Sequence, residues 1–254
     1  MLTHSQIKYV QSLQQKKFRR QYGAFVAEGE KIVSELWAST FRVEGVYALT
    51  GWLESHRNQI PQGIDIYEVS EKDLGRISGL KTPNRVLAVV RMPEAGNEPE
   101  PGAGGLTLLL DQVQDPGNLG TIIRTADWFG IRRIVCSPDT VEVFSAKVVQ
   151  ATMGSFLRVD VNYSELVPFL EKVKGKFPVY GAFLEGTDHY DVEAAKDGLL
   201  VIGNESKGIS PAVASLVNKK VRIHGGRKPG KADAAESLNA SVAAGILMAW
   251  FSKK

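Results

Sequence analysis

The residues best suited to chemistry lie in the run DQVQDPGNLGTIIRTA at 111–126, directly after the apolar stretch LTLLL at 106–110. The apolar stretch predicts a buried, parallel strand. The D-P-G sequence at 115–117 is typical of a turn, and Asn118 is a good N-cap for a helix that would carry Arg124. Both side chains are therefore expected near the carboxyl edge of a sheet, where open α/β sheets bind ligands.

Two further polar runs follow in the second half of the chain. GNESKGIS at 203–210 comes after the apolar run LLVI at 199–202, and its glycines would let backbone approach a ligand closely. ESLNASVAA at 236–244 opens the last predicted helix, where Ser237 and Asn239 offer hydrogen bonds. Read alone, the first is also typical of a tight strand-to-helix turn and the second of an ordinary capped helix.

In this order the three runs resemble the motifs of the SpoU (TrmH-type) RNA ribose 2′-O-methyltransferases of the SPOUT superfamily. These motifs are D-x-x-x-D-P-x-N-x-G with a following Arg, then G-x-E-x-x-G, then S-L-N-x-S-x-A. The sequence departs from them mildly at Ser206, where the family often has Gly. It departs more at His224, where the family usually has Pro, and in the long basic stretch 225–235. We interpret His224 as a partly exposed bystander, with an RNA phosphate contact as the alternative.

The resemblance implies S-adenosyl-L-methionine as cofactor and a set of site residues. The implied catalytic residues are Arg124, Asn118, Glu205, Asn239 and Ser237. The implied cofactor contacts, made largely by backbone, are Phe183, Leu184, Leu200, Ile202, Gly203, Asn204, Gly208, Ile223 and Leu238.

Arg124 is expected to be essential in one of two ways. It could accept the proton of the ribose hydroxyl, although a guanidinium is normally always protonated. It could instead orient a phosphate or stabilise developing oxyanion charge. The alternative without function is an ion pair with Asp127 or another acid on the helix surface.

Strands and helices alternate from residue 106 onward. The strands are predicted at 106–110, 132–136, 178–183, 199–203 and 220–223, and the helices at 118–129, 144–153, 164–174, 210–217 and 237–252. This alternation predicts an α/β fold with a mostly parallel sheet covered on both faces by helices. The resemblance adds a C-terminal trefoil knot around the cofactor and a homodimer formed through this domain.

The first 92 residues predict a small α/β sandwich, and residues 93–105 predict a Pro/Gly/Glu-rich linker. A basic amphipathic helix is expected over 1–20, with Ile7, Val10 and Leu13 facing inward. The region resembles the L30e/L7Ae-like RNA substrate-binding domain that precedes many SpoU domains. Glu28 is expected to cap the following helix. The predicted domains are thus 1–92 and 106–254.

Charge is distributed unevenly although the net charge is only +3. Residues 1–27 and 219–231 contain several lysines and arginines and no acid. Such segments attract polyanions, although each alone could be a solvated surface. The predicted RNA contacts are Lys16, Lys17, Arg19, Arg20, Arg222, Arg227 and Lys228. The resemblance favours structured rRNA over tRNA as the partner.

Several classes of protein are disfavoured by the sequence. Cys136 is the only cysteine, and the four histidines show no metal-site spacing, so neither a disulfide nor a metal is expected. No leader segment and no apolar run long enough for a membrane span is visible, which predicts a cytoplasmic protein. The glycine fingerprints of dinucleotide and P-loop proteins are absent, which disfavours an unrelated α/β nucleotide enzyme. A catalytically silent RNA-binding protein on the same fold stays open as the main alternative.

Overall fold

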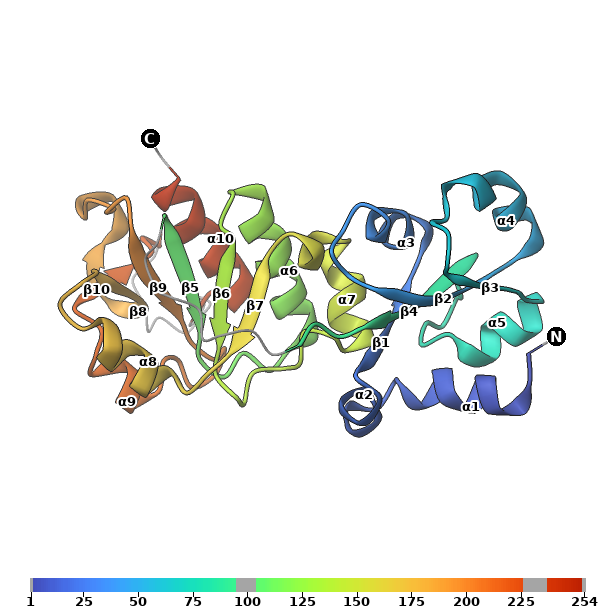
Figure 1. The fold of residues 1–254 in the computed structure, drawn as a ribbon. Helices are drawn as coiled ribbons and strands as arrows, with labels where there is room; N and C mark the ends of the chain where they lie inside the picture. The colour runs from blue at the N-terminus through green and yellow to red at the C-terminus, as the bar shows by residue number, and fades with distance from the viewer. Residues whose placement is uncertain (1, 95–103, 226–236, 253–254) are drawn as a thin grey trace. The chain divides into compact units, whose positions relative to one another are not determined.

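The computed structural model describes residues 2–94, 104–225 and 237–252 (Figure 1). The backbone forms two compact units. The first consists of residues 1–96 together with 142–157, and the second of residues 97–141 together with 158–254. Most of the predicted linker, and the basic residues Arg227 and Lys228, lie outside the described residues.

The first unit contains a four-stranded sheet in the order β1-β4-β2-β3, antiparallel except for the parallel pair β2/β3. Its strands are β1 (Ala24–Glu28), β2 (Val43–Ala48), β3 (Asp65–Glu68) and β4 (Val86–Arg91). Its helices include α1 (His4–Ser12), α2 (Lys16–Tyr22), α3 (Glu30–Leu36), α4 (Thr50–His56), α5 (Glu71–Ile77) and α7 (Ala146–Thr152), with 3₁₀ turns at Arg57–Gln59 and Ser155–Leu157. The predicted small α/β fold is confirmed.

The predicted N-terminal helix is two helices, α1 and α2. The apolar residues Ile7, Val10 and Leu13 are buried as expected. Arg19 corrects the prediction that the basic residues all face outward, because it is only 3% exposed. Its guanidinium donates to the carbonyl oxygens of Leu13 (3.0 Å) and Gln14 (2.9 Å) and pairs with Glu142. Arg19 therefore anchors α2 and is not available at the surface for RNA.

Residues 142–157 pack with the first unit, although the sequence places them inside the second predicted domain. Helix α7 packs against β1. The rings of Phe144 and Phe156 lie 4.6 Å and 5.8 Å from the ring of Phe25, measured between centroids. This segment has the apolar pattern of any crossover between parallel strands, so its pattern alone does not reveal which core it joins.

Glu28, at the end of β1, does not cap the next helix as predicted. Its carboxylate is buried and accepts hydrogen bonds from the Ser78 hydroxyl (2.5 Å) and the Gly79 backbone N–H (2.7 Å). It therefore holds the segment that follows α5. Burial raises the pKa of the Glu28 carboxyl above its ordinary value, and the two hydrogen bonds oppose this shift only in part.

This raised pKa predicts a pH-dependent stability of the wild type. The folded state binds the Glu28 proton more tightly than the unfolded state does. The contribution of the protonated carboxyl is therefore fully present below the unfolded pKa of 4.5 and is lost as pH rises through the folded value. In Glu28→Gln this loss should be absent, so the variant should gain stability relative to the wild type as pH rises.

Urea unfolding of both proteins from about pH 4 to about pH 7 measures this difference. Glu54→Gln is the matched control, because Glu54 is exposed on α4. A difference between Glu28→Gln and wild type that stays constant over this pH range would contradict the prediction.

The second unit is built on a six-stranded parallel sheet in the order β10-β8-β9-β5-β6-β7 (Figure 1). Its strands are β5 (Leu106–Leu110), β6 (Arg133–Cys136), β7 (Asp160–Tyr163), β8 (Val179–Asp188), β9 (Gly198–Ile202) and β10 (Lys219–Arg222). Its helices are α6 (Pro116–Trp128), α8 (Leu166–Val173), α9 (Pro211–Ala214) and α10 (Ala240–Phe251), with a 3₁₀ turn at His189–Asp191. The predicted parallel α/β fold is confirmed, and β7 is an additional edge strand.

Helices cover this sheet and leave the carboxyl ends of its strands for loops. Helices α8 and α9 pack on the face that carries Leu109, Val135 and Val201. Helices α6 and α10 pack on each other. The register between β8 and β10 jumps from Gly181 to Thr187, so residues 182–186 bulge from the sheet. Within the described residues, no helix is long and apolar enough to cross a membrane.

Candidate functional site

The loops after β5 and β9 are tied together by a buried carboxylate. Asp111, 3% exposed, accepts a hydrogen bond from the backbone N–H of Ser210 (2.7 Å). Its own N–H donates to the carbonyl oxygen of Ile202 (2.9 Å). The first and second sequence motifs thus meet at the carboxyl edge of the sheet. The sequence motifs predict no role for Asp111, although an acid directly after a buried strand indicates a polar group at this edge.

Gln112 holds the same junction through its backbone. Its φ of 60° lies in the left-handed region, which is uncommon for a residue with a side chain. Its N–H donates to the Ser137 hydroxyl (2.8 Å), and its carbonyl oxygen accepts from the side-chain amide of Asn204 (2.8 Å). The loops that follow the neighbouring strands β9, β5 and β6 are therefore joined around Gln112.

The N-cap of α6 is Asp115 and not Asn118, which corrects the prediction. The Asp115 carboxylate accepts from the backbone N–H of Asn118 (2.8 Å), and Pro116 occupies the first turn. Aspartate is as good a cap as asparagine, and proline is favoured immediately after it. Because the cap is supplied by Asp115, the side chain of Asn118 is free for other contacts.

A chain of hydrogen bonds connects the three sequence motifs. The Asn239 side-chain amide donates to the Asn118 Oδ1 atom (2.9 Å), and the Asn118 amide donates to the Glu205 Oε1 atom (2.5 Å). Asn118 is 8% exposed at the centre of this chain. Asn239 is the N-cap of α10, where its Oδ1 atom accepts from the backbone of Ser241 and Val242. Three of the five predicted catalytic side chains therefore lie together.

Arg124 and Ser237 do not join this chain. Arg124 is exposed on α6, about 9 Å along the helix axis from Asn118. It makes no hydrogen bond or ion pair within the described part of the chain. Asp127 pairs with Arg158 at 2.9 Å, so the predicted alternative of an Arg124–Asp127 pair is not what the structure has. Ser237 is exposed just before α10.

The second motif forms a closed loop. Asn204 and Gly208 exchange two backbone hydrogen bonds of 3.0 Å and 2.9 Å, and the Asn204 Oδ1 atom accepts from the N–H groups of Ser206 and Lys207. A Cβ atom on Gly203 would lie 2.3 Å from the Gly208 carbonyl carbon. Gly203 thus allows the loop to close on itself, whereas the sequence suggested close approach of a ligand.

We expect Gly203→Ala to open this loop. A Cβ atom 2.3 Å from backbone cannot be accommodated by a rotamer change, so the free energy of unfolding should fall by about 1–3 kcal/mol. Denaturant titration measures this loss. Ser206→Ala is the control, since Ser206 is exposed and only its backbone takes part in the loop. Equal stability of the two variants would contradict the packing role of Gly203.

The predicted cofactor segments lie around the same edge. Leu200 and Ile202 are buried in β9, so only their backbone could touch a ligand. The Phe183 ring packs onto the core and lies 5.1 Å from the Lys220 ammonium. Leu184 (60% exposed) and Leu238 (46% exposed) leave apolar surface uncovered. Exposed apolar side chains beside closed polar loops fit a nucleoside-type ligand.

His224 is exposed, and its imidazole has a partner within the fold. Its Nδ1 atom lies 3.1 Å from the Asp188 Oδ2 atom, and an Arg222 nitrogen lies 3.9 Å from the same oxygen. A hydrogen bond from the Tyr190 backbone N–H, followed by the charges of His224, His189 and Arg222, holds the pKa of the Asp188 carboxyl below its ordinary value. Arg222 is thus partly engaged. Lys16, Lys17 and Arg20 are exposed as predicted, although the Arg20 Nε atom lies 4.0 Å from the Glu142 Oε1 atom.

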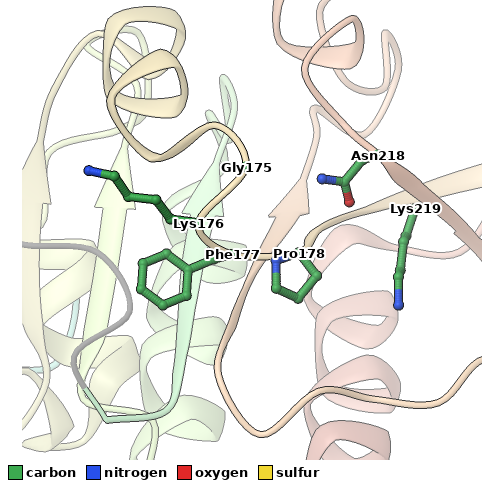
Figure 2. A pocket seen from close by; sticks show the side chains of 6 residues that line it. All are labelled: Gly175, Lys176, Phe177, Pro178, Asn218 and Lys219. Carbon is green, nitrogen blue, oxygen red and sulfur yellow. The ribbon is translucent and has the colours of Figure 1, made fainter.

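A pocket of about 430 Å³ lies at the amino ends of the strands, away from the carboxyl edge of the sheet (Figure 2). It is lined by Gly175, Lys176, Phe177, Pro178, Asn218 and Lys219, where β8 and β10 begin. It is therefore separate from the loops that follow the strands. Among the described residues, no group of three or more histidine, cysteine or acidic side chains could hold a metal ion.

Fold and site define an α/β protein whose parallel sheet carries an asparagine–glutamate hydrogen-bond chain at its carboxyl edge. Residues 105–249 match the SpoU rRNA Methylase family, and residues 4–88 match the MRM3-like substrate binding domain. The chain belongs to the SpoU rRNA methylase family.

Similar proteins match nearly the whole of this chain. The 23S rRNA (guanosine(2553)-2′-O)-methyltransferase RlmP of Bacillus subtilis is 31% identical over 253 residues, covering 96% of this chain and 95% of that protein. A TrmH-family structure from Porphyromonas gingivalis is 39% identical, with a TM-score of 0.86, and covers 99% of this chain and 98% of its own. An AdoMet-bound rRNA methyltransferase from Sinorhizobium meliloti is 29% identical, with a TM-score of 0.85 and coverage of 99% and 95%.

Proposed function

We propose that this protein is an S-adenosylmethionine-dependent methyltransferase that acts on a ribose 2′-OH of structured RNA, with rRNA as the substrate class. The single observation that carries the proposal is the Asn239–Asn118–Glu205 chain, which joins all three family motifs at the ligand edge of the sheet. The names of RlmP and of the AdoMet-bound relative support the reaction and the cofactor. A cytoplasmic location fits such a substrate.

Different residues of the protein would hold the methyl donor and the ribose acceptor. S-adenosylmethionine supplies the activated methyl group, and the segments around Leu184, Gly203, Ile223 and Leu238 would hold it. Asn118 and Glu205 shape the acceptor site, with Asn239 and Ser237 organising it. Such alignment is the main contribution a protein can make when the cofactor carries the reactive group.

Arg124 acts beside the reacting hydroxyl in this proposal. Its charge orients an adjacent phosphate and stabilises the oxyanion that develops as the proton leaves. The exposed position of Arg124 and its lack of a partner among the described residues leave the guanidinium available for RNA.

The first unit would hold the RNA. We assign residues 1–92 to substrate binding, 93–105 to a linker and 106–254 to catalysis, with residues 142–157 of the catalytic part packed into the first unit. The match of residues 4–88 to a substrate binding domain supports this division. Lys16, Lys17 and Arg20 would contact phosphates, which makes affinity fall with salt. Arg227 and Lys228 would add contacts from the basic segment before the third motif.

We also propose a homodimer formed through the second unit, with a trefoil knot around the cofactor. Trp128 at the end of α6 is 84% exposed and Val242 on α10 is 48% exposed, and these two helices pack on each other. Trp128→Glu should shift the protein from dimer to monomer in sedimentation. A wild type that sediments as a monomer would contradict the dimer.

The test of the function is calorimetric titration of S-adenosylmethionine into the wild type, together with radiolabelled methyl transfer to unmodified total RNA. Binding and transfer at ribose O2′ are expected. Cofactor binding without transfer to any RNA, or RNA binding without cofactor binding, would favour the catalytically silent RNA-binding protein.

A further inference from the structure

Helix α2 reverses the usual division between buried and exposed side chains. Arg19 is its buried residue, held by two carbonyl oxygens and Glu142. Tyr22 is 38% exposed, and Phe18 is only half-buried. Folding normally buries aromatic rings and leaves arginine in water. A helix that is anchored by a buried arginine, while its two aromatic rings stay partly exposed, indicates a binding role for these rings.

The two rings are arranged together and supported from behind. Phe18 and Tyr22 lie one helical turn apart, with ring planes 17° from parallel and centroids 6.2 Å apart. Tyr22 also meets the ring of Tyr9 edge-on at 5.2 Å, and the Tyr9 hydroxyl donates to Glu44 (3.0 Å). The Tyr22 carbonyl oxygen accepts from Arg91 (2.7 Å). The pair is therefore held in place before any ligand arrives.

The charge around the pair identifies the ligand. Lys16, Lys17 and Arg20 on the same helix are exposed, and residues 1–27 contain no acid. Glu142 pairs with Arg19 and lies 4.0 Å from Arg20, which leaves the two lysines as the unpaired cations among the described residues of this helix. The Lys17 ammonium lies 5.7 Å from the centroid of the Phe18 ring. Basic residues interleaved with exposed aromatic rings fit unpaired RNA, whose phosphates pair with the cations while its bases stack on the rings.

We propose that Phe18 and Tyr22 form a stacking platform for an unpaired base of the substrate RNA, so that α2 selects single-stranded over fully paired segments. This inference rests on the proposed function for its substrate class. It assigns to α2 a task beyond phosphate contact, because a fully paired duplex offers no free base to stack.

The test uses the full-length protein and two probes, a hairpin RNA with 2-aminopurine in its loop and a blunt duplex of the same stem. Wild type should change the 2-aminopurine fluorescence on binding. The double variant Phe18→Leu, Tyr22→Leu should lose this change and bind the hairpin at least about fivefold more weakly. Its affinity for the duplex and the salt dependence of binding should stay as in wild type, because the cations are intact.

Two controls separate stacking from folding. Tyr22→Phe keeps the ring and should retain the fluorescence change, and so should Tyr67→Leu on β3, at the opposite edge of the sheet from β1. If the double variant does not fold, the fluorescence change is compared between Tyr22→Leu, which should lose it, and Tyr22→Phe, which should keep it.

Three results would overturn the proposal. One is an unchanged fluorescence response in the folded double variant, or in folded Tyr22→Leu where only that comparison is possible. Another is an equal loss of affinity for hairpin and duplex. The third is a change of oligomeric state in sedimentation without any change in RNA binding, which would make the rings a protein-docking surface. Absence of methyl transfer by a wild type that still gives the fluorescence change would instead refute only the proposed reaction.

Discussion

Replacing Arg124 by alanine is expected to reduce methyl transfer at least about 100-fold, the usual cost of losing a group that stabilises developing negative charge. Affinity for S-adenosylmethionine should stay within about twofold of wild type, because Arg124 is exposed and makes no hydrogen bond or ion pair with the described residues of the predicted cofactor segments. Radiolabelled transfer to unmodified RNA and calorimetry measure the two quantities separately.

Two further variants sharpen this prediction. Arg132→Ala removes an exposed arginine of the same unit that lies just before β6, at the amino end of that strand and away from the carboxyl edge of the sheet. This variant should keep wild-type activity. Arg124→Lys keeps the charge but not the planar fork of donors. Partial activity in the lysine variant would support phosphate orientation. Wild-type transfer by Arg124→Ala would remove Arg124 from the mechanism.

The second large effect is expected from Asn118→Asp. The introduced carboxylate would face the Glu205 carboxylate across a contact that is 2.5 Å in wild type. Repulsion between like charges at such short range costs about 1–4 kcal/mol, more than the roughly 0.3–1 kcal/mol by which an acid stabilises a helix N-terminus. We expect a matching loss of stability and at least a tenfold loss of methyl transfer, roughly what 1.4 kcal/mol corresponds to.

The compensating change is Glu205→Gln in the same protein. The amide at position 205 can donate to the introduced carboxylate, whose other oxygen still accepts from Asn239. The hydrogen-bond chain is thus restored, with only the bond between positions 118 and 205 reversed in direction. Stability measured by denaturant titration should recover in the double variant. Recovery of activity as well would give Glu205 a positioning role, and recovery of stability alone would show that its charge acts on the substrate. Equal instability of Asn118→Asp and the double variant would contradict the hydrogen bond between positions 118 and 205.

Much of the fold follows from local pattern. The apolar run at 106–110 is β5 as predicted, and the apolar faces of α1 and α6 lie where their helical spacing puts them. These features depend on neighbouring residues, because strand and helix periods are set within a few positions. The short polar edge strand β7 escaped prediction because its pattern, half-exposed, lacks an apolar run.

The motifs supplied the identities of the site residues, but only the tertiary structure decided what they contact. Asn118 meets Glu205 and Asn239 across 87 and 121 residues, and Arg19 meets Glu142 across 123. Residue type alone allowed Asn118 to be a helix cap and Arg19 an RNA contact. In the structure, Asp115 is the N-cap of α6 and Arg19 is buried. Both outcomes differ from the prediction because contacts between distant segments depend on how the sheets and helices pack. No local propensity encodes that packing, whereas residue types and short-range periodicity are written directly in the sequence.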